Sequence, residues 1–403
     1  MPALRVTLVS HAAQRGGAET AAMRLIEALD QRSVDIDAVL LAEGPWAGEL
    51  GSLLPVSMVE MGAAASVARS EAARARSVQR NVRSTMAAAR ALAAHCRQQG
   101  TELLAANSLK AAAVCALAAP LARVPWVWHL HDRLAKDYLP GALVHVSRAA
   151  ATALPRAIVA NSMATARTLG RATRRKVAIA YPGVPDGWFD DPGPDTDGPV
   201  VMLGRVSETK GQLEFADAVM QAAPRLPGVP FVVAGDALFQ DGGYRDALAR
   251  HPAVRTGAVT LAGWVDDPSR ILRSSRLLVH ASPVPEPFGQ VIVEAMAAGV
   301  PVVATAAGGA GEVLGGSRDA LSIGDGVWRA RHGLAARPGD ARALGSAIEH
   351  AIRHPEEMAA LAAAARTHAW ETYRIVDTAR VTLEVWHHAS GRGQGLPPLH
   401  ALH

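Results

Sequence analysis

The chain has 403 residues, of which 49% are hydrophobic and 19% are charged, a composition typical of folded domains. A single hydrophobic core has usually stopped growing at this length, so the sequence predicts two domains. The formal net charge of +4 is too small to indicate a nucleic-acid-binding protein, and no nucleic acid partner is expected.

Short β-branched runs alternate with Ala- and Leu-rich helical patterns along the whole chain, which predicts βα units around parallel sheets. The expected strands of the first half cover residues 4–10, 35–42, 102–107, 124–130, 157–161 and 177–181. The segment DDPGPDTDGP at 190–199 follows and is the expected linker. Further strands are expected at 200–205, 230–236, 259–264, 276–282 and 301–309. The sequence therefore predicts two consecutive α/β domains, at 1–189 and 200–375.

Cysteines and long apolar runs say little about function in this chain. Cys96 and Cys115 are the only cysteines and lie in Ala-rich helical patterns without metal-ligand spacing, so we expect buried thiols and no disulfide. The N-terminus lacks the features of a signal peptide, and no apolar run is long enough to cross a bilayer. The expected location is the cytoplasm.

Glycines and basic residues follow two of the expected strands, at the sheet edge where parallel sheets bind ligands. Gly16 and Gly17 follow the first strand and open a helix whose amide groups favour an anion. Arg205 and Lys210 follow the strand at 200–205 and offer a planar fork and a point charge that suit a diphosphate. A plain βα turn and a solvated surface loop are the alternatives.

Two glutamates lie within the mostly apolar stretch PVPEPFGQVIVEAMAAGVPVV, residues 283–303. Glu286 is expected in a loop, and Glu294 in the second turn of a helix that starts near Phe288 and Gly289. Since a phosphate repels a carboxylate, we expect both glutamates to accept hydrogen bonds from sugar hydroxyls. The alternative is that they only stabilise the helix N-terminus through its dipole.

Several segments of the second half resemble, in order, the signature blocks of glycosyltransferase family 4. They are GRVSETKG (204–211), AGD (234–236), LAGWVDD (261–267), EPFGQVIVEAMAAGVPVVATAAGGAGEV (286–313) and HGLAARPGD (332–340). The first half is similar more loosely, through RGGAE (15–19) and HLHD (129–132). The resemblance implies a retaining, metal-independent enzyme with the GT-B fold, in which the sheets of two Rossmann-like domains face each other across a cleft.

The resemblance also implies a division of labour along the chain. The N-terminal domain would bind the acceptor, and the C-terminal domain a nucleotide-diphosphate sugar, the donor substrate, with no further cofactor. The helix at about 376–390 would pack back on the first domain. A flexible tail is expected at 391–403.

The resemblance further assigns roles to single residues. Arg205 and Lys210 would bind the donor's diphosphate, Glu294 would hold the ribose, and Glu286 would face the donor sugar near its anomeric carbon. His131 would lie near the transferred sugar. The other expected donor contacts are Gly16 and Gly17 from the first domain, Gly263, Trp264 and Val265 at the base, and Phe288, Gly289 and Gln290 in the pocket lining. Strand alternation points His129 to the opposite side from His131, which indicates a structural role.

Two Asp-x-Asp triplets, at 35–37 and 195–197, are of the kind that holds a divalent cation in a different glycosyltransferase fold. The first lies at the amino end of a strand and the second in the linker, so we expect no metal site. The expected reaction is a front-face transfer with retention, in which cations stabilise the departing phosphate. A nucleotide-sugar epimerase of the same fold and a non-catalytic sugar-nucleotide-binding protein are the alternatives.

An Arg-rich helix is expected at 66–99, where seven arginines stand against one acid, Glu71. Such a helix could rest on anionic lipid at the inner membrane face and collect a lipid-linked acceptor. Its apolar side is mostly Ala, without Trp, Phe or Leu before Leu92, which favours a solvated arginine face instead. A glycolipid, a polysaccharide and a small secondary-metabolite core all stay open as acceptors.

Overall fold

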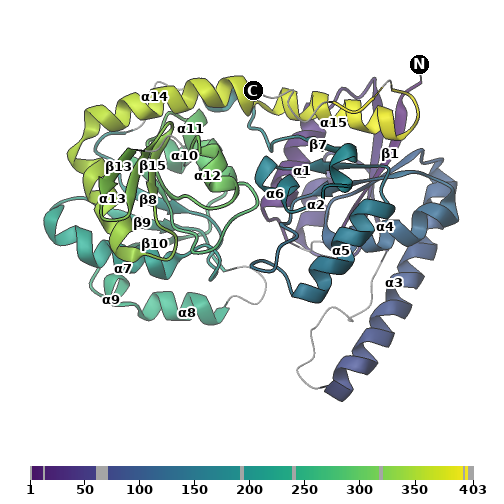
Figure 1. Ribbon diagram of the computed structural model, residues 1–403, viewed down its shortest axis with the longest axis horizontal. Coiled ribbons are helices and arrows are strands. Elements are labelled where there is room, and N and C mark those ends of the chain that lie inside the picture. The colour runs from purple at the N-terminus through teal and green to yellow at the C-terminus, as the bar shows by residue number, and fades with distance from the viewer. Residues whose placement is uncertain are drawn as a thin grey trace. The chain divides into compact units, whose positions relative to one another are not determined.

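The chain divides into two compact units in the computed structural model, which describes residues 2–11, 14–59, 71–190, 195–237, 242–316, 321–393 and 395–397, without side chains at 71–81. The first unit contains Met1–Asn161, Thr165–Ala180 and Val376–His403 (Figure 1). The second contains Ser162–Ala164 and Tyr181–Ile375. The chain therefore enters the second unit at Tyr181, ahead of the expected linker at 190–199.

The earlier boundary follows from contacts made just after Ala180. The Tyr181 ring stacks on Phe288 with centroids 5.8 Å apart, and Val184 pairs with Arg374 in an isolated β-bridge. The described end of the expected linker, 195–199, also docks on the second unit, where the Asp195 amide donates to the carbonyl of Arg273 over 3.1 Å. This end of the segment is therefore part of the second unit, which differs from the expected free linker.

The first unit is built on a parallel sheet of seven described strands, in the order β3-β2-β1-β4-β5-β6-β7. Its strands are β1 (Leu4–Ser10), β2 (Val34–Leu40), β3 (Val56–Met58), β4 (Leu103–Ala106), β5 (Trp126–Leu130), β6 (Ala157–Ala160) and β7 (Val177–Ile179). Most are buried apolar runs, as expected for parallel strands covered on both faces. The expected strands are present, and β3 is an addition.

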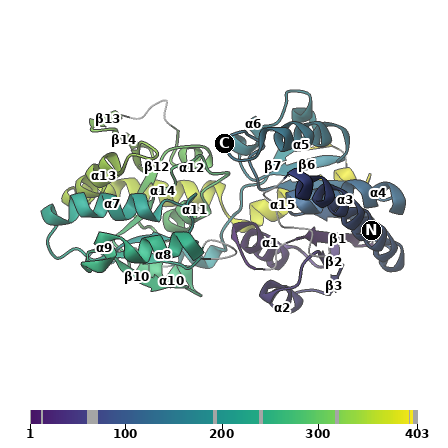
Figure 2. The same ribbon diagram turned by 90° about the horizontal axis from the view of Figure 1, so that it is seen from below.

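Helices cover both faces of this sheet. They are α1 (Gly17–Ala28), α2 (Pro45–Gly51), α3 (Glu71–Gln99), α4 (Leu109–Ala122), α5 (Gly141–Ala153), α6 (Met163–Arg167) and α15 (Ile375–Ala389). Apolar residues of α1, α2 and α15 share one core cluster with the sheet, and α3 runs beside α4 (Figure 2). Cys96 and Cys115 are buried free thiols, which confirms the expected packing role.

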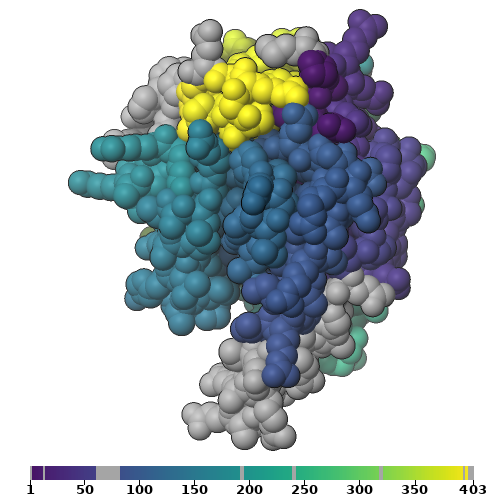
Figure 3. Space-filling model, turned by 90° about the vertical axis from the view of Figure 1, so that its right-hand side faces the viewer, coloured from purple at the N-terminus to yellow at the C-terminus, as the bar shows by residue number. Residues whose placement is uncertain are grey.

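The C-terminal segment belongs to the first unit. Trp386 of α15 is fully buried, and its Nε1–H donates to Nε2 of His129 over 3.0 Å, which gives His129 the structural role expected for it. Beyond the helix, Arg392 pairs with Glu102 and donates to the carbonyl of Pro2 over 2.7 Å. Figure 3 shows this segment, in yellow, against the purple N-terminal residues. The expectation of a flexible tail is therefore wrong for Arg392, because an ion pair and a hydrogen bond tie it to residues that precede β4 and β1.

The second unit is built on eight described strands in the order β10-β9-β8-β11-β12-β15-β14-β13. They are β8 (Val200–Leu203), β9 (Phe231–Ala234), β10 (Thr260–Gly263), β11 (Leu277–His280), β12 (Val302–Thr305), β13 (Leu321–Gly324), β14 (Val327–Ala330) and β15 (Gly333–Ala336). The first six in this order are parallel, whereas β14 and β13 continue the sheet antiparallel. Strands β13, β14 and β15 are additions to the expected ones.

Helices also cover both faces of the second sheet. They are α7 (Gln212–Ala222), α8 (Gly242–Arg250), α9 (Pro252–Arg255), α10 (Pro268–Arg273), α11 (Gln290–Ala297), α12 (Gly309–Val313), α13 (Ala341–Arg353) and α14 (Pro355–Thr372). One core cluster joins the sheet to α7 and α13, which lie side by side in Figure 2, and another joins it to α11 and α14. No helix in the described part of the chain is both long and apolar enough to cross a membrane.

Candidate active site

A buried carboxylate lies just beyond the carboxyl end of β11, in the middle of the second sheet. The loop after this strand brings Glu286 next to Gly308, with which it forms a β-bridge, and the carbonyl of Glu286 accepts a hydrogen bond from the Gly309 amide over 2.8 Å. Gly308 has φ +65°, and a Cβ there would lie 2.3 Å from the Glu286 carbonyl oxygen. Only glycine permits this approach, which fixes the backbone of Glu286.

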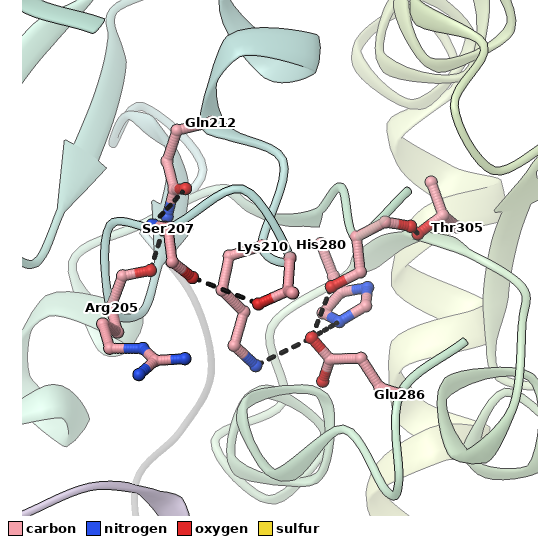
Figure 4. A network of polar contacts seen from close by, with 9 residues as sticks. Arg205, Ser207, Lys210, Gln212, His280, Glu286 and Thr305 are labelled. Atoms are coloured by element: carbon pink, nitrogen blue, oxygen red, sulfur yellow. Dashed lines mark hydrogen bonds and ion pairs between the residues drawn. The ribbon is translucent and has the colours of Figure 1, made fainter. Parts of the chain in front are cut away.

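The loop after β8 brings a cation to this carboxylate. It ends at Gly211, where φ is +82° and a Cβ would lie 2.2 Å from the carbonyl oxygen of Ala281, just after β11. This close approach places Nζ of Lys210 2.7 Å from Oε1 of Glu286 (Figure 4). The structure therefore brings together two residues that lie 76 positions apart in the sequence.

The buried side chain of Gln212 stabilises the same loop through two hydrogen bonds to its backbone. Its Nε2 donates to the carbonyl of Arg205 over 2.8 Å, and its Oε1 accepts from the Ser207 amide over 3.2 Å. In Figure 4 the guanidinium of Arg205 extends on the same side of the loop as the Lys210 ammonium. Two cations thus lie at the carboxyl end of β8, the site where parallel sheets bind anionic ligands.

Three polar groups meet at a single oxygen of Glu286. Besides Lys210, the hydroxyl of Ser282 donates to Oε1, and Nε2 of His280 lies 3.3 Å from the same atom. Burial alone would raise the pKa of Glu286, but the charge of Lys210, together with the contact of His280, outweighs burial and holds the pKa well below its usual value. Glu286 is therefore ionised at neutral pH. Among the described residues, no hydrogen bond reaches its other oxygen, Oε2.

The second glutamate lies on α11, as expected. The helix is preceded by Gly289 with φ +104°, and Glu294 is buried in its second turn, where its carboxylate accepts a hydrogen bond from Gln290 over 3.3 Å. The Phe288 ring is buried against Tyr181 and Tyr373. This corrects the expectation for its side chain, which packs in the core instead of lining a pocket.

The residues expected at the base follow β10 at the edge of the same sheet. The carbonyl of Gly263 accepts from the Gly235 amide over 2.7 Å, which ties the end of β10 to the end of β9. Trp264 is 49% exposed, and its Nε1–H donates to Asp266 over 2.9 Å, whereas Val265 packs against the core cluster of α11. An exposed indole at the end of β10 offers a flat apolar surface for a base.

In the first unit, the glycine pair differs from expectation. Helix α1 begins at Gly17, and the amide of Gly16 donates to the Glu19 carboxylate over 3.0 Å in a capping box. This N–H group is therefore occupied, and a carboxylate in the first turn opposes an anion at that position. The expected anion-binding role of Gly16 and Gly17 is not supported by this geometry.

His131 follows β5 at the carboxyl edge of the first sheet. Burial lowers its pKa to about 4, so the ring is neutral at pH 7. Its Nε2 lies 2.9 Å from Oδ1 of Asn107, whose amide nitrogen faces the carbonyl of Ala18 over 3.5 Å. With the proton on Nε2, the Nδ1 atom is an acceptor for a hydroxyl group. Asn107 was not singled out from the sequence, although it is the polar residue that ends the expected strand at 102–107.

The aspartate triplets have structural partners. Asp37 accepts a hydrogen bond from Thr7 over 2.7 Å and pairs with His95 over 2.5 Å. Asp195 accepts from the Asp197 amide over 2.9 Å, as in a turn. Across the described ranges, no three His, Cys, Asp or Glu side chains are grouped as metal ligands.

The structure thus gathers Arg205, Lys210 and Glu286 in the second unit, where Glu294 and the 263–265 segment also lie, and it places Gly16, Gly17 and His131 in the first. Sequence reasoning missed His280, Ser282 and Gln212. The available signal was a histidine that ends a buried apolar strand, followed two residues later by a serine.

Two family models match the chain. The model described as Glycosyltransferase Family 4 matches residues 15–187, and the model described as Glycosyl transferases group 1 matches residues 198–354. The lipopolysaccharide core biosynthesis glycosyltransferase LpsE of Rhizobium meliloti is 40% identical over 110 residues, which are 27% of this chain and 30% of that protein. The D-inositol 3-phosphate glycosyltransferase of Mycolicibacterium smegmatis is 32% identical over 178 residues, 39% of this chain and 40% of its own.

The matched part spans less than half the length of either relative. A solved structure is similar over the full length: HepE from Anabaena in complex with UDP-glucose, with a TM-score of 0.76 and 25% identity over 96% of this chain and 100% of its own. The two matches to glycosyltransferase models, which divide the chain between them, and this likeness show the GT-B fold of two Rossmann-like α/β domains.

Proposed function

We propose that the chain is a retaining, metal-independent glycosyltransferase that moves a sugar from a UDP-sugar to a hydroxyl group of an acceptor. The observation that carries this proposal is the charge centre of the second unit, where Lys210 lies 2.7 Å from the buried Glu286 and Arg205 extends beside it. The UDP-glucose complex of HepE, which is 25% identical to this chain, supports UDP-glucose as the donor to test first.

The two cations of the loop after β8 suit the departing diphosphate. As the bond from the anomeric carbon to the phosphate breaks, negative charge grows on the phosphate oxygens and positive charge on the sugar ring. A guanidinium and an ammonium beside the bound diphosphate stabilise the first of these charges. They supply the positive charge that a divalent ion supplies elsewhere, which supports a metal-independent reaction.

Glu286 suits the sugar end of the donor. Its Oε1 is occupied by Lys210 and Ser282, so the oxygen that remains to accept hydrogen bonds from sugar hydroxyls is Oε2. A carboxylate held by an ammonium and a hydroxyl is a weakened nucleophile, which favours front-face transfer over a covalent glycosyl-enzyme. In that mechanism the leaving phosphate takes the proton of the acceptor hydroxyl and the anomeric configuration is retained.

The acceptor is proposed only as a class. The relatives named above act, by their names, on lipopolysaccharide core and on D-inositol 3-phosphate, two acceptors with little in common beyond hydroxyl groups. A glycolipid, a polysaccharide and a secondary-metabolite core are all consistent with the first unit, where the neutral His131 presents an acceptor nitrogen.

Calorimetry and NMR test the proposal together. UDP and UDP-glucose should bind, and GDP and ADP should bind at least about tenfold more weakly. Slow hydrolysis of UDP-glucose in the absence of acceptor should release α-glucose first, as NMR spectra taken before mutarotation would show. Release of β-glucose would mean inversion, and an epimerised sugar as the sole product would identify an epimerase. Binding without any UDP release under acceptor screening would indicate a non-catalytic protein.

A further inference from the structure

A histidine occupies the last position of β11, where the strand pattern calls for an apolar side chain. Leu277 and Val279 face one core cluster and Leu278 faces the other, so His280 lies on the same side as Leu278 and α11. It is only 4% exposed and pairs across the sheet with Ala304. Burying an imidazole at this position costs free energy that a leucine or valine would not.

The carboxylate of Glu286 lies against the ring of His280 and offsets part of this cost. Its Nε2 lies 3.3 Å from Oε1 of Glu286, and Figure 4 shows the ring edge facing that carboxylate. Among the described residues, neither ring nitrogen makes a hydrogen bond of regular geometry. The contact with Glu286 is therefore the feature of the site that accounts for a histidine here.

The three groups around Oε1 differ in how firmly they are held. His280 and Ser282 are buried on and just after β11, and the carbonyl of Ser282 accepts a hydrogen bond from Thr305 over 2.7 Å. Lys210 comes from a separate loop, and its side chain is 33% exposed. The backbone of the sheet thus holds His280 and Ser282, whereas Lys210 lies on a separate loop with part of its side chain exposed to a ligand.

The proposed reaction places two demands on Lys210. The ammonium compensates the buried charge of Glu286, and the same group is needed at the donor's diphosphate. When it turns toward phosphate, Glu286 loses part of its compensation, and a buried carboxylate without a partner is strongly unfavourable. Donor binding would then displace the carboxylate unless other groups hold it.

We propose that His280 is a positioning residue that, together with Ser282, holds Oε1 of Glu286 so that Oε2 stays directed at the donor sugar while Lys210 contacts the diphosphate. The inference rests on the proposed function, since it requires a nucleotide sugar in the site. It predicts that His280 affects the sugar-dependent part of donor binding and turnover, and leaves the affinity for UDP unchanged.

Three substitutions separate this role from packing. His280→Gln places an amide N–H near the position of Nε2, His280→Asn places one near Nδ1, and His280→Leu keeps the volume without a donor. We expect His280→Leu and His280→Asn to lower UDP release from UDP-glucose by about tenfold or more, and His280→Gln to restore it to within about threefold of the wild-type protein. The affinity for UDP, from calorimetry, should stay within about twofold in all three.

A double-mutant cycle tests whether His280 acts through Glu286. In a Glu286→Gln background, His280→Leu should have no further effect on UDP release or on UDP-glucose affinity. The exposed His354, in the same unit, provides a matched control, because His354→Gln should change neither measurement. If His280→Leu lowers the melting temperature by more than about 5 °C, its loss of activity can come from unfolding. The test of the positioning role is then whether His280→Gln keeps more UDP release than His280→Asn.

Two results would overturn the positioning role: His280→Leu that keeps UDP release within about threefold of wild type, or an equal loss of affinity for UDP and UDP-glucose. Failure of the unmodified protein to bind UDP and UDP-glucose would overturn the proposed donor and this inference together. Binding of both ligands with additive effects of His280→Leu and Glu286→Gln would overturn this inference alone.

Discussion

Lys210 is the residue on which the proposed chemistry depends most. Its side chain is one-third exposed and lies against a buried carboxylate, so it meets both the ligand and the protein. Replacing Lys210 or Arg205 by Ala should lower turnover by on the order of 10²-fold or more, because each removes positive charge that matters most as the phosphate departs. Steady-state UDP release measures the effect.

Lys210→Ala should also weaken the fold of the site, since it leaves Glu286 with Ser282 and His280 alone. Arg205→Ala lacks this complication and is the cleaner of the two variants. A matched control is Arg225→Ala, a partly exposed arginine of the same unit paired with Glu349, which should keep full turnover. A loss of less than about threefold in Arg205→Ala and Lys210→Ala would remove both from the site.

The two glutamates should respond differently to substitution. Glu286→Gln removes the charge near the sugar and should reduce turnover more than UDP-glucose binding, because a developing positive charge is stabilised only in the transition state. Glu294→Ala should mainly weaken binding of UDP and UDP-glucose alike, as expected for a ribose contact. Calorimetry with both ligands, combined with kcat, separates these outcomes, and equal losses of binding in the two variants would contradict the division of roles.

The positions of the candidate site residues could be predicted where they depend on the neighbouring strand or helix in the sequence. Arg205, Lys210, Glu286 and Glu294 follow strands or open helices, and the structure places them at the sheet edge where such positions lie. The contact between Lys210 and Glu286 could not be predicted, because it depends on how closely two distant loops approach at Gly211. The role of Phe288 was missed for the same reason, since its partners Tyr181 and Tyr373 are remote in sequence.

Among the elements, strand β5 makes the first unit sensitive to acid, because His129 lies on it and His131 follows it. Burial and the nearby His131 lower the pKa of His129 to about 3, and burial lowers that of His131 to about 4. Both groups bind protons more readily in the unfolded chain, where the pKa is about 6.5. Their contribution to stability is therefore complete above pH 6.5 and is lost as the pH falls toward the folded values.

We expect the free energy of unfolding of the first unit to fall by roughly 1 kcal/mol per pH unit or more between pH 6 and pH 4.5. Urea unfolding followed by tryptophan fluorescence at several pH values measures this slope, since Trp386 contacts His129 directly. His354→Gln, which changes an exposed histidine, should leave the slope unchanged. A stability that is flat from pH 7 to pH 4.5 would mean that these histidines are accessible to protons in the folded state.

Helix α3 is the element that was considered for contact with a membrane. Within the part of the helix whose side chains are described, Arg83, Arg90 and Arg97 are exposed, whereas Leu92 is fully buried. The one large apolar side chain that the sequence offered as a wedge is thus used in the core. The remaining arginines at 69–80 lie outside the described side chains. We therefore expect liposomes with and without acidic lipid to co-sediment equally little protein; strong acid-lipid-dependent binding would restore the lipid-linked acceptor as the leading class.

Strand prediction succeeded for buried strands and failed at one edge. Strands such as β6 and β9, with the sequences AIVA and FVVA, are continuous apolar runs between helical patterns, which is a strong local signal. The hairpin of β13 and β14 was missed because β13 is an exposed strand of four residues, LSIG, which is too short to give a clear strand pattern. Its pairing is set by the turn at Asp325 and Gly326, which have φ of +51° and +75°.

For the whole molecule, the charge arrangement leads to a prediction about metal. The cations of Arg205 and Lys210 would repel a divalent ion beside the diphosphate, and the aspartate triplets are tied to protein partners. Transfer or hydrolysis should therefore persist in excess EDTA, and added magnesium or manganese should change the rate by less than about threefold. An activity that vanishes on chelation and returns with manganese would show that the phosphate site is assigned wrongly.

The two-unit organisation was predictable from the repeat of βα patterns, but the point where the chain passes between units was not. Composition marked 190–199, whereas the contacts of Tyr181 and Val184 place the passage ten residues earlier. A Pro- and Gly-rich composition predicts low helix and strand propensity. It does not predict which unit the ends of the segment pack against.

The placement of α15 has a consequence for folding during translation. The second unit is almost continuous in sequence, from Tyr181 to Ile375, whereas the first is completed only by Val376–His403. Because the fully buried Trp386 belongs to the core cluster of the first sheet, the N-terminal half of the chain lacks part of its interior until α15 has been translated. At about 5–20 residues per second, the half made first waits many seconds with an open core while the half made second can already close. We therefore expect the second unit to complete its core before the first, the reverse of the usual order in which the N-terminal domain folds first.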